Sequence, residues 1–223
     1  MKRMLIYMVV SLLMGALTAC TGKQGDKGAE RYHINFSETS HIEKANKSVL
    51  IISGSPRKGG NTDLLCDAFA RGAEEAGGRV EKIFLADYRI DYFSEVDEQR
   101  VGDRAGEAED DVPMLVDKMV RADVIVLASP VYYMNITGQL KTFIDRTFGR
   151  YREMKDKEFF YLTACADPEE STADWAVNAF RGFVMCLPNP TERGMVKAIV
   201  MGRKGAVKGS QYEEEAYNLG KRI

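Results

Sequence analysis

The chain has few of the residues that build metal centres and nucleophilic sites, with 2 histidines and 4 cysteines among 223 residues. His33 and His41 lie in a polar stretch, and Cys66, Cys165 and Cys186 show neither Cys-x-x-Cys spacing nor a nearby pair of histidines. These absences argue against a zinc site, a disulfide framework and a catalytic centre built on histidine. We therefore expect no metal ligands in the protein.

An excess of either charge is also absent, because 31 basic and 33 acidic side chains leave a formal net charge of −2. Electrostatic attraction to nucleic acid or to an anionic membrane surface is therefore not expected. Apolar residues make up 45% of the chain, which is enough to bury the core of one ordinary domain. The expected partner of such a domain is a small molecule.

The sequence has no apolar run long enough for a stable membrane span. After Met1-Lys2-Arg3, the apolar stretch from Met4 to Leu17 is about fourteen residues long, against the roughly 20 that a spanning helix needs. It ends in Leu17-Thr18-Ala19-Cys20, which resembles a bacterial lipobox. The resemblance implies cleavage before Cys20, lipidation of its thiol and attachment to a membrane of the bacterial cell envelope. An unprocessed apolar segment on a cytoplasmic protein is the alternative.

The chain then divides into three parts. Residues 1–19 form the expected lipoprotein signal peptide, and residues 20–47 are a polar, glycine-containing tether that starts at the lipidated Cys20. Residues 48–223 form the folded domain. No internal repeat or low-complexity segment interrupts it.

Within this domain, β-prone apolar runs alternate with segments of helical periodicity. The predicted strands are Ser48–Ile52, Val80–Leu85, Val124–Ala128, Phe159–Thr163 and Met195–Met201. The predicted helices carry their apolar faces at Leu65–Ala76, Val112–Met119, Leu140–Phe148, Phe180–Leu187 and Gln211–Leu219, and Asn61 is expected to cap the first of them. Five strands that alternate with helices predict an α/β fold, a parallel sheet with helices on both faces. Ligands of such sheets bind at the carboxyl ends of the strands.

The segment Ser53–Thr62, called the phosphate loop below, follows the first strand and precedes a helix. It contains glycines, hydroxyl groups and two cations. Free N–H groups and the positive end of the helix dipole favour an anion there. Five side chains of this loop are the predicted phosphate ligands: Ser55, Arg57, Lys58, Asn61 and Thr62. An ordinary glycine-rich turn is the alternative.

The type of phosphate can be narrowed from the same residues. A Walker A loop that starts at Gly54 needs a lysine where Gly60 stands, and the dinucleotide fingerprint needs a glycine where Pro56 stands. A terminal monophosphate, as in FMN, remains.

The segment Ala128–Asn135, called the aromatic loop below, follows the most apolar strand. Tyr132 and Tyr133 can stack against a planar cofactor, and Asn135 can bond its polar edge, while Pro130 fixes the backbone. Two tyrosines that only pack against the protein are the alternative. Together with the phosphate loop, the pattern favours a flavin.

The two loops carry a family resemblance. Gly54-Ser55-Pro56-Arg57 with Asn61-Thr62, and Ser129-Pro130-Val131-Tyr132-Tyr133 with the segment 138–146, resemble the NAD(P)H-dependent FMN reductase and iron–sulfur flavoprotein group of flavodoxin-like proteins. The resemblance spans roughly residues 48–209. It implies a doubly wound five-stranded parallel sheet of order 2-1-3-4-5 with FMN across strands one, three and four. The flavin ring would be lined by Pro130, Val131, Tyr132, Tyr133 and Asn135. Thr163 and Cys165 would also line it, from the segment Thr163–Asp167 after the fourth predicted strand, called the third loop below.

Two departures from that family bear on function. Relatives often have glycines in the third loop, where this chain has Cys165 and Asp167. A small buried thiol is the expected role of Cys165, with a reactive thiol as the alternative. Iron–sulfur flavoproteins also carry a cysteine cluster where the acidic segment from Ile90 to Asp111 contains no cysteine, so we expect no iron–sulfur cluster.

The expected function is that of an FMN-dependent oxidoreductase, in which NAD(P)H delivers hydride to the flavin and a quinone, flavin or nitro compound accepts the electrons. No catalytic residue is named, because the flavin itself supplies the chemistry. Relatives commonly assemble so that a neighbouring subunit completes the flavin pocket, which implies a homo-oligomer. A non-enzymatic FMN electron carrier and a domain without flavin are the alternatives.

Overall fold

The computed structural model describes residues 35–36, 46–94 and 110–223. The predicted signal peptide, the lipidation site Cys20 and both histidines lie outside these ranges, so the predictions made for them stay predictions. None of the described helices combines the length and the apolar character that a membrane crossing needs.

All strands of the structure lie parallel in one sheet. They are β1 (Asn35–Phe36), β2 (Ser48–Ser53), β3 (Arg79–Phe84), β4 (Val124–Pro130), β5 (Glu158–Ala164) and β6 (Thr191–Ala198). Their order is β1-β6-β5-β4-β2-β3. The five long strands therefore run in the order 2-1-3-4-5, which confirms the predicted fold. The short β1 at the edge of the sheet was not predicted.

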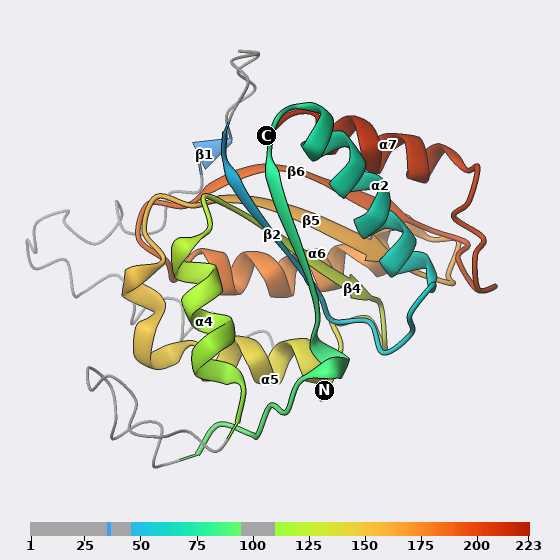
Figure 1. Ribbon diagram of the computed structural model, residues 1–223. Coiled ribbons are helices and arrows are strands. Elements are labelled where there is room, and N and C mark those ends of the chain that lie inside the picture. Colours follow the sequence, from blue (N-terminus) through green and yellow to red (C-terminus); the bar gives the residue numbers. More distant parts are fainter. Residues whose placement is uncertain (1–34, 37–45, 95–109) are drawn as a thin grey trace, which may run out of the picture. The chain divides into compact units, whose positions relative to one another are not determined.

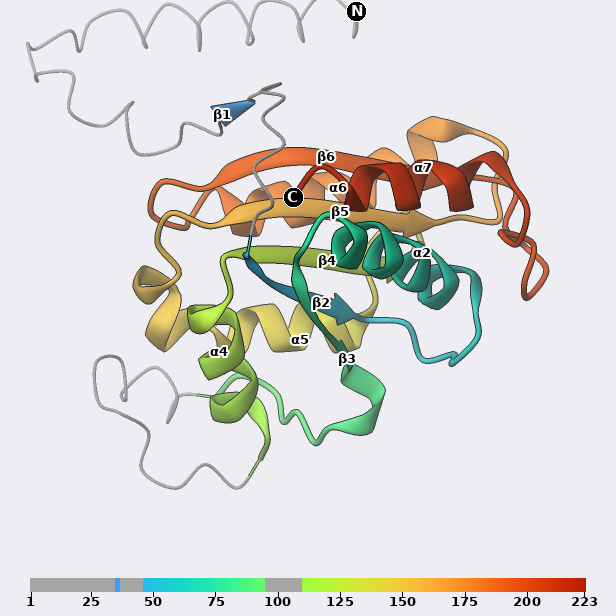
Figure 2. The same ribbon diagram turned by 45° about the horizontal axis from the view of Figure 1, so that its top comes forward.

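Helices cover both faces of the sheet (Figures 1 and 2). They are α2 (Asn61–Glu75), α4 (Val112–Arg121), α5 (Gly138–Arg146), α6 (Glu170–Val184) and α7 (Gln211–Gly220), with the short 3-10 helices η2 (Leu85–Asp87) and η3 (Phe148–Glu153). Side chains of α2 and α7 pack into one apolar cluster, and those of α4, α5 and α6 pack into the other. The chain is thus doubly wound around the sheet.

The central strands are buried on both faces, as their continuous apolar sequences predict. Ile51 and Ile52 on β2 are neighbours in sequence, point to opposite faces and are each 0% exposed. Burial of each such side chain contributes about 1.5–3 kcal/mol to stability. The carboxyl ends of β2 and β4 are therefore held by a rigid core.

Two details of the sequence prediction are wrong. The last strand begins at Thr191 rather than Met195, because the buried carboxylate of Glu192 is satisfied by Arg181 of α6 and lets a polar segment join the sheet. Phe148 does not continue the apolar face of α5, since that helix ends at Arg146 and the Phe148 ring is exposed on η3.

Helices α2 and α7 approach each other through glycine. A Cβ atom on Gly72 would collide with the carbonyl oxygen of Tyr217, and one on Gly220 would collide with the carbonyl oxygen of Phe69. Figure 2 shows the two helices side by side over the sheet. This close contact holds α7, and the chain segment that precedes it, near α2.

Candidate functional site

The phosphate loop is folded tightly at the carboxyl end of β2. A Cβ atom on Gly54 would lie 2.7 Å from the Cβ of Leu140 and 2.9 Å from the Oγ1 of Thr137. A Cβ atom on Gly60 would lie 2.9 Å from the carbonyl oxygen of Arg57. Only glycine fits these two positions without a shift of the backbone around it.

Gly60, rather than the predicted Asn61, is the N-cap of α2, and no side chain caps this helix end. The first turn of a helix leaves N–H groups without an intrahelical partner. Those of α2 follow directly on the phosphate loop, where Ser55 and Thr62 are buried. The Oγ of Ser55 accepts a hydrogen bond of 3.2 Å from the N–H of Arg57. The helix terminus thus offers backbone donors to an anion.

Asn61 has a different role from the predicted one. Its Nδ2 donates to the carbonyl oxygens of Met201 and Arg203, both at 2.8 Å, and its Oδ1 accepts from the N–H of Val207 at 3.3 Å. Both amide hydrogens are used in these bonds, so the side chain does not face a phosphate. Asn61 instead joins the start of α2 to the loop after β6.

Charges around the phosphate loop are partly neutralised. The ammonium group of Lys58 donates to Asp87 at 2.6 Å and lies over the ring of Phe84, so the structure turns this predicted phosphate ligand towards η2. Arg57 is exposed and has no ion-pair partner among the described residues. Arg57 is therefore the cation of the loop that stays available to a ligand.

Asp63 fixes the exit of the same loop. Its carboxylate accepts the N–H of Gly59 at 2.7 Å and the ammonium group of Lys82 at 2.7 Å. Burial disfavours the charged form of Lys82, but hydrogen bonds to Asp63 and Asp67 outweigh burial and raise the pKa of Lys82. Because Asp63 is neutralised in this way, its charge does not oppose an anion at the start of α2.

The aromatic loop is a tight turn that presents tyrosine to solvent. Tyr132 and Asn135 exchange two backbone hydrogen bonds of 2.9 and 3.0 Å. Between them Tyr133 and Met134 have φ values of 48° and 58°, a conformation that bulky residues rarely adopt. The Tyr133 side chain is 104% exposed. Backbone strain of this kind, about 1–3 kcal/mol for each residue, clusters at functional sites.

The other side chains predicted to line the ring divide into two groups. Pro130 and Val131 are partly exposed beside the turn, and Asn135 is exposed, with its Oδ1 bound to the N–H of Ile136. Thr163 and Cys165 are buried at 0% and 4% exposure, and the Thr163 hydroxyl donates to the carbonyl oxygen of Val196 at 3.4 Å. Both side chains are therefore largely covered by protein, and their predicted contact with the cofactor stays a prediction.

Four loops are joined by hydrogen bonds at this end of the sheet. Thr137 Oγ1 donates to the carbonyl oxygen of Gly54 at 2.8 Å, and the N–H of Val131 donates to the carbonyl oxygen of Ala164 at 3.0 Å. The N–H of Met201 then donates to the carbonyl oxygen of Cys165 at 2.7 Å, and Asn61 bonds Met201 in turn. The phosphate loop, the aromatic loop, the third loop and the loop after β6 form one connected unit.

Sequence analysis missed two parts of this unit, Thr137 and the loop after β6. Thr137 caps α5 by accepting from the N–H of Leu140 at 3.3 Å, and a Thr-Gly pair before an apolar helix face is a signal for such a cap. The loop after β6 contains Gly202-Arg203-Lys204-Gly205. Its position after the last strand could have identified it, since ligands gather at the carboxyl ends of strands.

A cleft of about 300 Å³ lies at the opposite end of the sheet, where β2 and β3 begin. Its wall includes Ser48, Arg79 and the paired side chains of Lys118 and Glu81. Because ligands of doubly wound sheets bind at the carboxyl ends of the strands, this cleft is not the candidate cofactor site.

Within residues 46–94 and 110–223 no cluster of three or more histidine, cysteine or acidic side chains could hold a metal ion. The three cysteines of this part, Cys66, Cys165 and Cys186, are all free thiols. Residues 95–109 lie outside the described chain, so the absence of an iron–sulfur cluster stays a prediction.

Comparison with known proteins identifies a family and several relatives. The profile of a family described as NADPH-dependent FMN reductase matches residues 48–190. An iron–sulfur flavoprotein of Archaeoglobus fulgidus is 38% identical over 112 residues, and an NAD(P)H dehydrogenase (quinone) of Paracoccus denitrificans is 30% identical over 96 residues. These alignments cover 48% and 42% of this chain, and 49% and 42% of the two relatives.

Solved structures share the fold at low sequence identity. An NAD(P)H:quinone oxidoreductase from Methanothermobacter marburgensis superposes with a TM-score of 0.63 at 18% identity, over 79% of this chain and 96% of that chain. An azoreductase from Bacillus anthracis superposes with a TM-score of 0.63 at 17% identity, over 79% of this chain and 100% of that chain. At such identities the likeness concerns the fold.

Proposed function

Because the chain belongs to the NADPH-dependent FMN reductase family, we propose that it binds FMN and transfers hydride from NAD(P)H to a small acceptor. Quinones, free flavins and nitro compounds are the acceptor classes. The observation that carries the proposal is the uncapped amino terminus of α2 beside Arg57, at the carboxyl end of a doubly wound sheet. Quinone reductases and azoreductases share the fold, which supports this choice of acceptors.

The residues present fit the phosphate end of FMN. Gly54 and Gly60 keep the phosphate loop in a shape that a Cβ atom at either position would disturb. Arg57 would add a charge-assisted contact, and Ser55 and Thr62 would place hydroxyl groups at the same point. The first-turn N–H groups of α2 would complete the anion site.

The aromatic loop fits the flavin ring. Tyr133 is exposed, and its backbone is held in a left-handed conformation by the two hydrogen bonds between Tyr132 and Asn135. An aromatic ring held in this way can stack on a planar cofactor with little loss of side-chain freedom. The hydrogen bond from Thr137 to Gly54 keeps this loop in register with the phosphate loop.

The protein's part in the reaction is to bind and to orient. FMN supplies the exchange of hydride between nicotinamide and acceptor. Arg57 and the start of α2 would hold the phosphate end, and Tyr132 and Tyr133 would contact the flavin ring.

The test is spectroscopic and uses the full chain purified in mild detergent. We expect flavin absorbance after FMN is added, and bleaching of that absorbance by NADPH or NADH without oxygen. Flavin that dithionite reduces and neither nucleotide reduces would instead identify an electron carrier. A protein that takes up no FMN would overturn the proposal.

We also propose that the protein is lipid-anchored through Cys20 to a membrane of the bacterial cell envelope. The lipobox-like Leu17-Thr18-Ala19-Cys20 sequence supports this location. Cells fed labelled palmitate should label the wild-type chain and leave Cys20→Ala unlabelled. Equal labelling of both chains would contradict the anchor.

A homo-oligomer is proposed on the resemblance to flavin reductases alone. Light scattering on the purified chain should give at least twice the mass of one protomer after subtraction of detergent. A monomer that binds FMN fully would contradict it.

A further inference from the structure

The loop between β6 and α7, residues 199–210, reaches the phosphate loop from the far end of the sequence. The Nζ of Lys204 lies 3.8 Å from the position that a Cβ atom on Gly59 would take. On the next glycine, the Cβ of Arg57 lies 3.2 Å from the position of a Cβ on Gly60. Lys204 and Arg57 therefore flank consecutive residues at the start of α2.

The position of Lys204 is fixed by its neighbours in the 199–210 loop. The carbonyl oxygen of Arg203 and that of Met201 each accept a hydrogen bond of 2.8 Å from Asn61. Val207, which is 0% exposed, packs into the core and bonds the Asn61 side chain through its N–H. Asn61, the first residue of α2, thus binds the backbone on both sides of Lys204.

The charges of this corner are unbalanced. In the described ranges the neighbouring cations Lys58 and Lys82 are paired with Asp87 and Asp63, but neither Arg57 nor Lys204 has a carboxylate partner. The amino end of α2 adds a further partial positive charge. An anion bound beside the start of α2 would be stabilised by these positive groups.

We propose that Lys204 is a second cation for the phosphate of FMN, and that Asn61 is the residue that positions it. The proposal rests on the proposed function, because the anion is the phosphate of the same flavin. The Lys204 ammonium group is a point charge on a flexible side chain, and it would complement the directed hydrogen bonds of the Arg57 guanidinium group.

The experiment compares FMN with riboflavin, which has the same ring and no phosphate. The full chain, purified in mild detergent and freed of flavin, is titrated with each compound while flavin fluorescence is followed. We expect Lys204→Gln to weaken FMN binding about tenfold, as for loss of one charged contact, and to leave riboflavin binding unchanged. The dependence of FMN affinity on salt should also become weaker.

Three further variants separate this role from a structural one. Lys204→Arg should keep most of the FMN affinity, and Lys208→Gln, an exposed lysine of the same loop, should keep all of it. Asn61→Ala should weaken FMN binding, and the addition of Lys204→Gln should then cost less than it does in the wild type, because the two residues act together.

Equal losses of FMN and riboflavin affinity in Lys204→Gln, or no loss of either, would overturn the inference. Fully additive losses in the double variant would overturn the role given to Asn61. If the wild-type chain binds neither flavin, the proposed function itself fails, and this result is distinct from all of the others.

Discussion

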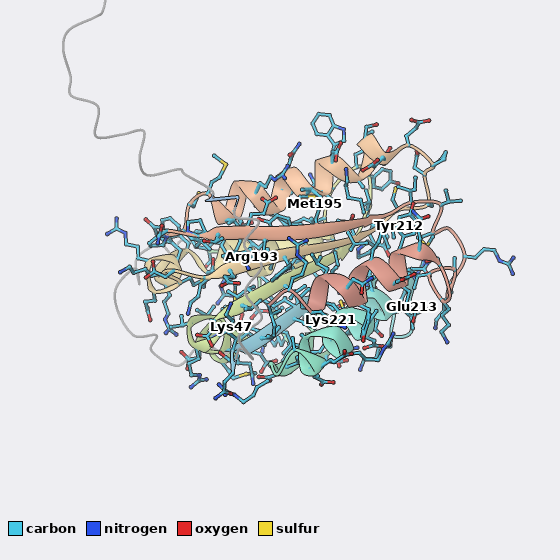
Figure 3. The ribbon with its side chains drawn as sticks, turned by 90° about the horizontal axis from the view of Figure 1, so that it is seen from above. Lys47, Arg193, Met195, Tyr212, Glu213 and Lys221 are labelled. Carbon is cyan, nitrogen blue, oxygen red and sulfur yellow. The ribbon has the colours of Figure 1, made fainter. Side chains whose placement is uncertain are left out.

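The two ends of the sheet differ in the pairing of some of their charged side chains. Where the strands begin, Glu158 lies 2.7 Å from the ammonium group of Lys47 and 3.3 Å from Nε of Arg193, and Asp123 accepts hydrogen bonds from the backbone N–H and the hydroxyl of Ser48. Figure 3 shows Lys47 and Arg193 at this end, while Tyr212 and Glu213 mark the other end, where α7 starts. Where the strands finish, Arg57 has no carboxylate partner among the described residues.

The difference separates stability from binding. Paired charges at the amino ends of the strands stabilise the chain without a ligand, because these side chains already have ion-pair or hydrogen-bond partners within the protein. At the carboxyl ends, unpaired cations, an uncapped helix and a strained turn raise the free energy of the chain without ligand. A bound anion and a bound ring would lower that free energy. Variants at the two ends should therefore change different quantities.

The largest expected effect is on stability, at the amino end. Glu192, with a side chain 2% exposed, accepts bonds of 2.7 and 3.0 Å from Arg181. Arg181→Leu leaves this carboxylate buried without its partner, which should lower the free energy of unfolding by about 3–5 kcal/mol. Urea unfolding measures the loss, and the FMN affinity of the folded fraction should not change. Combination with Glu192→Leu should restore most of the stability, and a single variant as stable as the wild type would contradict this account.

The next effect is on binding, at the carboxyl end. Arg57→Gln should weaken FMN binding by about ten- to a hundredfold, since a hydrogen bond to a charged group contributes about 1.5–3 kcal/mol. Unfolding of the flavin-free chain should change by no more than about 0.5 kcal/mol, because the side chain is exposed and unpaired. Lys58→Gln is the matched control, because Lys58 is paired with Asp87 and should affect FMN affinity less. A loss of stability without a loss of affinity would reverse the comparison.

A smaller effect is expected in the aromatic loop. Tyr133→Asn keeps a residue that tolerates the left-handed backbone and removes the ring. Loss of one stacked pair, about 0.5–1.5 kcal/mol, should weaken FMN and riboflavin alike by about three- to tenfold. An equal loss for both compounds indicates a contact with the flavin ring. Loss of the phosphate contact of Arg57 should instead weaken FMN binding and leave riboflavin binding unchanged. Unchanged affinity for both compounds would show that the flavin ring does not contact Tyr133.

The smallest effect concerns pH at the amino end. Burial disfavours the charged form of Asp123, but hydrogen bonds from the side chain and backbone of Ser48 outweigh it and lower the pKa of Asp123. The stabilisation is therefore present above the unfolded pKa of about 3.9 and is lost as pH falls through the lower folded value. Ser48→Ala should lower the free energy of unfolding by about 1 kcal/mol or less at pH 7. Unfolding measured from pH 7 to pH 3 should show this difference between wild type and variant shrinking below about pH 4. FMN affinity at pH 7 should stay at the wild-type value.

Most of the fold could be predicted from the sequence. Runs such as Val49–Ile52 are apolar at every position, and a strand buried on both faces is the structure that such a run favours. The start of β6 could not be predicted in this way, because Glu192 joins the sheet only when Arg181 reaches it from another element. A contact between side chains of two different elements leaves no periodic signal in the sequence.

The candidate site also has features that the sequence predicts and features that depend on tertiary contacts. The sequence by itself predicted the fold family and pointed to the phosphate loop and the aromatic loop, because ligands of doubly wound sheets bind where the strands end and both loops follow predicted strands. Only the tertiary structure decided that Lys58 turns to Asp87, that Thr163 and Cys165 are buried, and that Asn61 binds the 199–210 loop. The physical reason is that a side chain's polar groups bind whichever partners the folded chain brings nearest, and α7 brings residues 199–210 to the start of α2 from more than 130 positions away.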